Sequence, residues 1–175
     1  GQARRMLRNL IEVYNTSDMR VLRLRVRDMD EYFSTQYPGA KDPPDIQLFK
    51  GTIREYEVEL LWAYFGIDAS AISALRLGFY KGDIFSEEPE VDRDVIPIYQ
   101  LIKKVNPTVV SVAFDPEGSG PDTHYKALQA VAEALRMYEK ETGNANIRVW
   151  GYRNVWYRYR PSEAELLIPV SLNSL

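Results

Sequence analysis

The segment TVVSVAF, residues 108–114, decides the fold of this chain. It is a nearly continuous run of β-branched and apolar residues, which suits a strand buried on both faces of a parallel sheet. A turn rich in Gly, Pro and Asp follows over 115–122. Apolar residues then recur at helical spacing over 123–142, and Gly143 ends that run. The sequence therefore predicts a strand, turn and helix at the centre of an α/β domain.

Strand and helix patterns alternate through most of the remaining chain. Helical spacing predicts helices over 46–64 and 91–105, the second weakened or kinked by Pro97. Alternating connections of this kind imply right-handed crossovers and a parallel sheet between layers of helices. We therefore predict a single domain over 1–175, a three-layer α/β/α sandwich with a mostly parallel sheet and a C-terminal β-hairpin. Its further strands are expected at 10–15, 22–27, 72–78 and 147–152, and the hairpin at 155–159 with 164–170.

The composition excludes several classes of function. The 175 residues include no cysteine, so disulfide scaffolds, thiolate metal sites and cysteine nucleophiles are excluded. The net charge of −3 gives no overall attraction to nucleic acid or to anionic membranes. The sequence has no run of about 18 apolar residues, and we expect a cytoplasmic protein. The chain starts with Gly1 rather than Met, which suggests a processed or partial chain.

The turn after residues 108–114 contains His124, the only histidine of the chain. Ligands of open α/β sheets bind beyond the carboxyl ends of the strands, where Asp115, Asp122 and His124 are expected. Asp122 or Thr123 is expected to cap the following helix, so that His124 projects from its first turn. His124 is then either a zinc ligand or a surface histidine, and Asp122 either a site residue or an N-cap.

Two arginine patterns leave further alternatives open. Arg54 and Glu57 are three residues apart on the predicted helix, where they form an ion pair or point the guanidinium at a substrate. Apolar and basic residues alternate strictly over 22–27, which predicts a half-exposed strand. Its arginines either protect a sheet edge or contact phosphate.

An ordered set of short motifs resembles the PIG-L/LmbE family of zinc-dependent N-deacetylases. It is most similar to the deacetylase-like domain that some bacteria carry behind glucosamine-6-phosphate deaminase. The likeness covers roughly 45–172. The motifs that carry it are GTIREYE at 51–57, LRLGFY at 75–80, Asp115-Pro116 with Thr123-His124, VWGYR at 149–153 with Trp156, and IPVS at 168–171.

The resemblance implies a Rossmann-like fold and hydrolysis of the acetamide of an N-acetylglucosamine-type sugar. Zinc polarises water in this family, and a carboxylate takes the proton. His124 matches the family's later zinc-binding histidine. Arg54 and Glu57 fall on its substrate-binding helix, and Tyr80 falls on the loop that lines the substrate pocket. Asp115 and Asp122 are further candidates for binding the substrate.

The chain departs from the family pattern in two places. It has no His-Pro-Asp-Asp segment, which supplies a histidine, an aspartate and the general base, so one of the three expected zinc ligands is present. Pro121 replaces a second histidine that is usual in the later motif. The missing segment lies upstream of Gly1 or was lost.

The sequence supports three functional hypotheses. The first is a zinc-dependent N-deacetylase. The second is a non-catalytic domain that binds an amino sugar or sugar phosphate beside a glucosamine-6-phosphate deaminase. The third is a nucleotide- or nucleic-acid-binding domain that uses Arg20, Arg23, Arg25 and Arg27, although the chain has no Gly-rich phosphate fingerprint.

Overall fold

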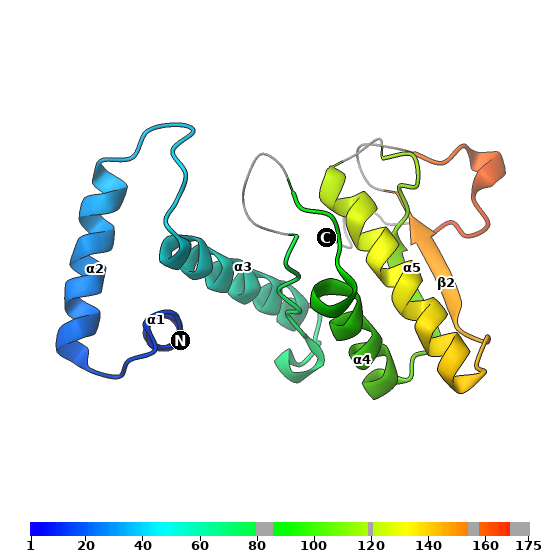
Figure 1. The fold of residues 1–175 in the computed structure, drawn as a ribbon, viewed down its shortest axis with the longest axis horizontal. Helices are drawn as coiled ribbons and strands as arrows, with labels where there is room; N and C mark the ends of the chain where they lie inside the picture. Colours follow the sequence, from blue (N-terminus) through cyan, green and yellow to red (C-terminus); the bar gives the residue numbers. More distant parts are fainter. Residues whose placement is uncertain (80–85, 119–120, 154–157, 169–175) are drawn as a thin grey trace. The chain divides into compact units, whose positions relative to one another are not determined.

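The computed structural model shown in Figure 1 describes residues 1–79, 86–118, 121–153 and 158–168. The chain divides into two compact units, Gly1–Ala74 and Leu75–Leu175. Each unit contains a hydrophobic cluster of its own. In the described ranges, no helix has both the length and the apolar character needed to cross a membrane. The prediction of one domain over 1–175 stays a prediction.

The unit Gly1–Ala74 is helical. It contains α1 (Gln2–Tyr14), α2 (Met19–Ser34) and α3 (Pro44–Tyr64), followed by a short 3-10 turn at Ala69–Ala71. The helix expected over 46–64 is therefore confirmed. Its first residue is Pro44, which suits a helix start because its missing N–H would have no partner there.

The strands expected at 10–15 and 22–27 are wrong, because both segments lie in helices. In α1, Leu7, Leu10, Ile11 and Tyr14 belong to or pack against one cluster at spacings of three and four, which is the helical period. The alternation over 22–27 is six residues long and imitates a strand only within that window. The Asp18 side chain starts α2 by accepting a hydrogen bond of 2.8 Å from the Arg20 N–H.

The three helices share one small core. Its buried members are Leu10, Leu22, Met29, Ile46 and Phe49. Polar contacts join the helices and the loop before α3: Tyr14 Oη donates to Asp45 at 3.1 Å, Tyr32 Oη donates to Asp42 at 2.8 Å, and Arg5 pairs with Glu59 at 2.8 Å.

The unit Leu75–Leu175 contains the α/β part of the chain. A π-helical turn at Val91–Val95 leads into α4 (Ile96–Val105), followed by β1 (Val109–Ala113), α5 (Asp122–Thr142) and β2 (Arg148–Tyr152). Helices α4 and α5 lie side by side (Figure 1). Pro97 stands in the first turn of α4, where its missing N–H is tolerated.

Helices α4 and α5 meet through a cluster of buried side chains. Tyr138 of α5 also donates a 2.7 Å hydrogen bond to the side chain of Asn106, which ends α4 in a left-handed conformation. Gly143 ends α5 in the same way, as its sequence position indicated. The buried members of the cluster are Val95, Ile98, Ile102, Ala130, Ala134 and Tyr138.

The two strands pair in parallel, with Val109 opposite Arg148 and Ala113 opposite Tyr152. This confirms both strands, the crossover helix and the parallel pairing. The expectation of burial on both faces is wrong: Val112 is buried, but Ser111 and all of β2 are exposed. Because the described sheet has two strands, the chain is a mixed α/β protein and the three-layer sandwich is not confirmed.

The strand expected at 72–78 is absent from the described residues, and so is any strand at 158–168. Arg76 adopts a φ of 50°, which interrupts an extended backbone. The Gly78 N–H donates to the Asp94 carboxylate rather than to a neighbouring strand. Near the C-terminus, Pro161–Glu163 forms a 3-10 turn where the hairpin was expected. The remaining hairpin residues, 155–157 and 169–170, lie outside the described residues.

Asp94 is a fully buried carboxylate that joins the segment before α4 to the start of that helix. It accepts hydrogen bonds from the Gly78 N–H at 2.5 Å, the Glu90 N–H at 2.9 Å and the Arg93 Nη2 at 2.9 Å. A side chain at Gly78 would meet Arg93 at 2.1 Å, so the backbone can approach this closely only at a glycine. Burial raises the pKa of Asp94, but these hydrogen bonds outweigh it and the net shift is downward.

Replacing Asp94 by alanine should lower the free energy of unfolding by about 2 to 3 kcal/mol, because two backbone N–H groups and the Arg93 guanidinium lose their acceptor. Urea unfolding at neutral pH measures this loss. Since the folded-state pKa of Asp94 is depressed, its contribution is complete above the unfolded value and disappears as pH falls through the folded value.

The matched control is Asp92→Ala, which removes an exposed carboxylate from the same turn. It should change the free energy of unfolding by less than about 0.5 kcal/mol. Equal effects of the two substitutions would contradict a structural role for Asp94.

Candidate functional site

The carboxyl ends of β1 and β2 lie at one edge of the sheet because the strands are parallel. The Phe114 N–H donates to the Tyr152 carbonyl at 2.8 Å, which continues the pairing past Ala113. Asp115 follows immediately and is buried, with 8% of its surface exposed. The Gly118 N–H donates to the Asp115 carbonyl at 3.2 Å, and Gly118 has a φ of 62°. The chain therefore turns sharply at the strand end.

Helix α5 begins at Asp122, and its N-cap residue is Pro121. The expectation that Asp122 or Thr123 caps the helix is therefore wrong, because both residues already lie inside its first turn. His124 is the third residue of the helix, as expected for a residue projecting from the first turn. Its N–H donates to the Pro121 carbonyl at 2.8 Å, and the residue is half-buried.

Asp122 belongs to a compact charged group that we call the Lys126 cluster, which consists of Ser86, Glu88, Asp122 and Lys126. The Lys126 Nζ lies 2.8 Å from Asp122, 3.2 Å from Glu88 and 2.8 Å from the Ser86 carbonyl. Ser86 Oγ also donates a hydrogen bond to Asp122. Lys126 is buried, whereas Asp122 and Glu88 have 60% and 80% of their side chains exposed.

The cluster fixes the charges of its members. The hydrogen bonds from Lys126 and then from Ser86 lower the pKa of Asp122. The hydrogen bond to Asp122 raises the pKa of Lys126 despite its burial, and Glu88 adds to this shift. Lys126 is therefore an ammonium ion near neutral pH and cannot serve as a general base. The cluster can instead hold a ligand through fixed charges and the Ser86 hydroxyl.

A second charged group follows the ends of the two strands. The Arg153 Nη2, one residue after β2, lies 3.2 Å from both carboxylate oxygens of Glu117 in the turn after β1. Its guanidinium carbon also lies 4.8 Å from the centre of the Tyr159 ring. The edge of the sheet thus presents carboxylates after β1 and a cation after β2.

The candidate residues selected from the sequence do not all lie in one compact unit. Asp115, Asp122 and His124 belong to one strand, turn and helix in the unit Leu75–Leu175. Arg54 and Glu57 are exposed on α3 in the unit Gly1–Ala74. Tyr80 lies outside the described residues. No result tests the substrate-binding roles expected for these residues, which stay predictions.

The described residues do not fit a zinc site. Zinc in proteins takes at least three protein ligands, even at catalytic sites. Within the part of the chain that the structure describes, no group of three His, Asp or Glu side chains is arranged to hold a metal ion. His124 is the one histidine of the sequence, so further ligands at this point would have to be carboxylates.

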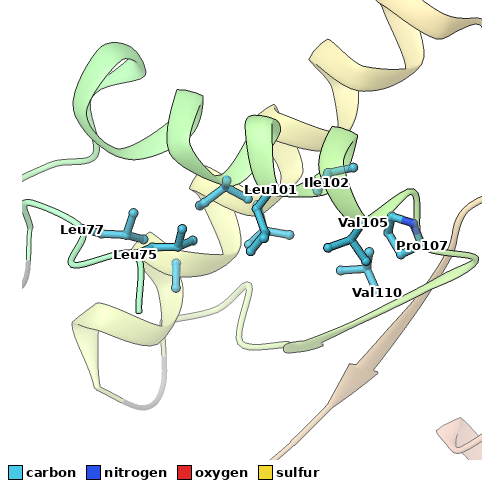
Figure 2. A pocket seen from close by; sticks show the side chains of 10 residues that line it. Leu75, Leu77, Leu101, Ile102, Val105, Pro107 and Val110 are labelled. Atoms are coloured by element: carbon cyan, nitrogen blue, oxygen red, sulfur yellow. The ribbon is translucent and has the colours of Figure 1, made fainter. Parts of the chain in front are cut away.

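A pocket of about 330 Å³ lies between α4, α5 and β1 (Figure 2). Leu75 and Leu77, side chains of α4 and α5, and Val110 of β1 line it. Every lining residue is apolar. A sugar needs convergent polar groups for its hydroxyls, so this pocket does not suit one.

Sequence reasoning missed Ser86, Lys126 and Arg153 as site residues. Lys126 carried a local signal, because an acid and a base four residues apart share one face of a helix. Arg153 directly follows a predicted strand, which is also a position where ligands bind. Ser86 had no such signal, because its contact with α5 joins residues 40 positions apart.

Replacing Lys126 by methionine should raise the pKa of Asp122 towards its ordinary value, since the hydrogen bond from Lys126 is the largest cause of the depression. A pH titration followed by NMR of the carboxyl carbon measures this shift. Lys140→Met, an exposed change on the same helix, should leave the pKa of Asp122 unchanged. An unchanged pKa in Lys126→Met would contradict the cluster geometry.

Comparisons with known proteins give one relative. No protein family matches the sequence, and no solved structure matches the fold. A curated protein of Bacteroides thetaiotaomicron, described as a glucosamine-6-phosphate deaminase-like protein, is 27% identical over 170 residues. The match covers 94% of this chain and 25% of that protein. The chain therefore spans about a quarter of the length of its relative.

Proposed function

We propose that this chain is a non-catalytic domain that binds an amino sugar or an amino-sugar phosphate and works beside a glucosamine-6-phosphate deaminase-like domain. The observation that carries this proposal is the similarity along 94% of the chain to a protein described as glucosamine-6-phosphate deaminase-like. The expected ligand site is the carboxyl edge of β1 and β2, where α/β proteins commonly bind small molecules.

The chemistry of this edge suits such a ligand. An amino-sugar phosphate carries one ammonium group, one phosphate and several hydroxyls. Asp122 and the buried Asp115 offer acceptors for the ammonium and the hydroxyls. Lys126 and Arg153 offer cationic donors for the phosphate. Both cations already lie against carboxylates, so their positions are set before a ligand arrives.

Calorimetric titration tests this proposal. The chain should bind glucosamine 6-phosphate more tightly than glucose 6-phosphate, which lacks the amino group. Asp122→Asn should weaken the binding of glucosamine 6-phosphate by about tenfold or more, since it removes a charge-assisted hydrogen bond. Glu139→Gln, which removes an exposed charge from the far end of α5, should have no effect. Equal affinity for the two sugars, or no binding of either, would sink the proposal.

A second candidate is the zinc-dependent N-deacetylase. The observation that favours it is His124, which lies in the first turn of α5 after β1, where the resemblance puts a zinc-binding histidine. Because the described residues do not fit zinc, this activity requires ligands that these residues do not supply.

The full-length gene product distinguishes the two candidates. Under the deacetylase hypothesis it should retain about one zinc ion per chain and release acetate from N-acetylglucosamine derivatives. His124→Ala should remove both properties, whereas Gln129→Ala, an exposed change on the same helix, should remove neither. Elemental analysis and an acetate assay measure the outcome. A full-length gene product without zinc and without acetate release leaves the binding domain as the function.

A further inference from the structure

Helix α2 exposes a stripe of large apolar side chains. Met19, Val26 and Phe33 are 47%, 44% and 44% exposed, and they stand seven residues apart. Seven residues make almost two helical turns, so the three side chains lie along one line of the helix. Leu22 and Met29, also seven apart, are buried in the core instead. The stripe therefore lies beside the buried face of α2 and extends along nearly the whole helix.

The charges of α2 are divided between its two halves. Arg20, Arg23 and Arg25 lie in the first half and Arg27 begins the second, whereas Asp28, Asp30 and Glu31 follow Arg27. Arg23 and Asp30 stand three and four residues from Val26, on the solvent side of the stripe. Both are exposed, and neither forms an ion pair with another residue that the structure describes.

We propose that α2 is a self-association helix that pairs in antiparallel fashion with α2 of a second copy of this chain. A two-fold axis beside Val26 brings Val26 against its own counterpart and Met19 against Phe33 of the second copy. The same axis brings Arg23 to Asp30 of the second copy, and this ion pair occurs twice. One patch thus matches itself, as a two-fold symmetric interface requires.

The charge pattern of α2 favours an antiparallel orientation of the partner helix, and it favours a second copy of this chain as the partner. A parallel pair would set Arg23 of one helix beside Arg23 of the other and Asp30 beside Asp30, which is unfavourable. An anionic membrane would attract the arginine half but repel Asp28, Asp30 and Glu31. An antiparallel second copy sets the positive part of each helix beside the negative part of the other. Coiled coils use charged residues beside an apolar seam in the same way to set partner and orientation.

The interface is small. Each partner contributes one 16-residue helix with three large apolar side chains, so the buried area lies at or below that of stable dimers. We therefore expect a reversible dimer with a dissociation constant in roughly the micromolar range rather than a permanent one.

Sedimentation equilibrium of the full 175-residue chain at increasing concentration tests this pairing. Arg23→Glu and Asp30→Arg should each raise the dissociation constant by at least about tenfold, because each puts like charges together at two symmetric places. The double variant R23E/D30R should return the constant to within about threefold of the original, because both ion pairs form again with reversed signs.

Glu31→Arg is the matched control, since it reverses a charge on the outer side of the same helix and should leave the dissociation constant unchanged. Circular dichroism shows whether every variant keeps its helices. A chain that stays monomeric at high concentration would overturn the proposal. So would a double variant no better than the single ones, or binding to anionic vesicles in place of self-association.

Discussion

The parallel pairing of β1 with β2 is the constraint on which the α/β unit depends. Parallel neighbours cannot be joined by a tight turn, so the chain must cross back over the sheet, and α5 makes this crossover. The register sets Ala113 opposite Tyr152. The residues that follow, Asp115 and Arg153, therefore emerge at the same edge. The first turn of α5, which contains Asp122, comes after the end of β1. The pairing of β1 with β2 therefore makes this edge of the sheet a candidate site.

How much of this fold the sequence predicts depends on the length of each pattern. The helical spacing over 123–142 spans more than five turns and has a glycine stop, and α5 has almost these bounds. The alternation over 22–27 is too short to distinguish a strand from a helix, and helix packing by Leu22 and Met29 decides it. For the site, too, only features that depend on a local sequence pattern could be predicted. The position of His124 followed from the strand before it, whereas the contact of Ser86 with Lys126 is set by tertiary structure alone.

The Lys126 cluster also limits how a ligand can bind. The Lys126 ammonium is buried and already contacts two carboxylates and Ser86, so an incoming anion must replace one of them. Glu88 is the most exposed member, which makes it the least costly to displace. When Glu88 is displaced, Asp122 keeps its hydrogen bond from Ser86. An anion in place of Glu88 would then lie beside a fixed carboxylate, an arrangement that favours a ligand carrying both signs of charge.

Because residues 19–34 form a helix rather than a strand, the arginines of α2 have a different arrangement from the one that the sequence pattern indicated. In a strand, Arg23, Arg25 and Arg27 would share one face and could follow a line of phosphates. In a helix, successive members of this set point about 200° apart. Arg25 lies over the ring of Tyr14, which packs against the core of the same unit. The continuous line of Arg23, Arg25 and Arg27 along one face is thereby lost. The same residues instead form the positive half of a helix whose other half is negative, and such a helix is complementary to itself.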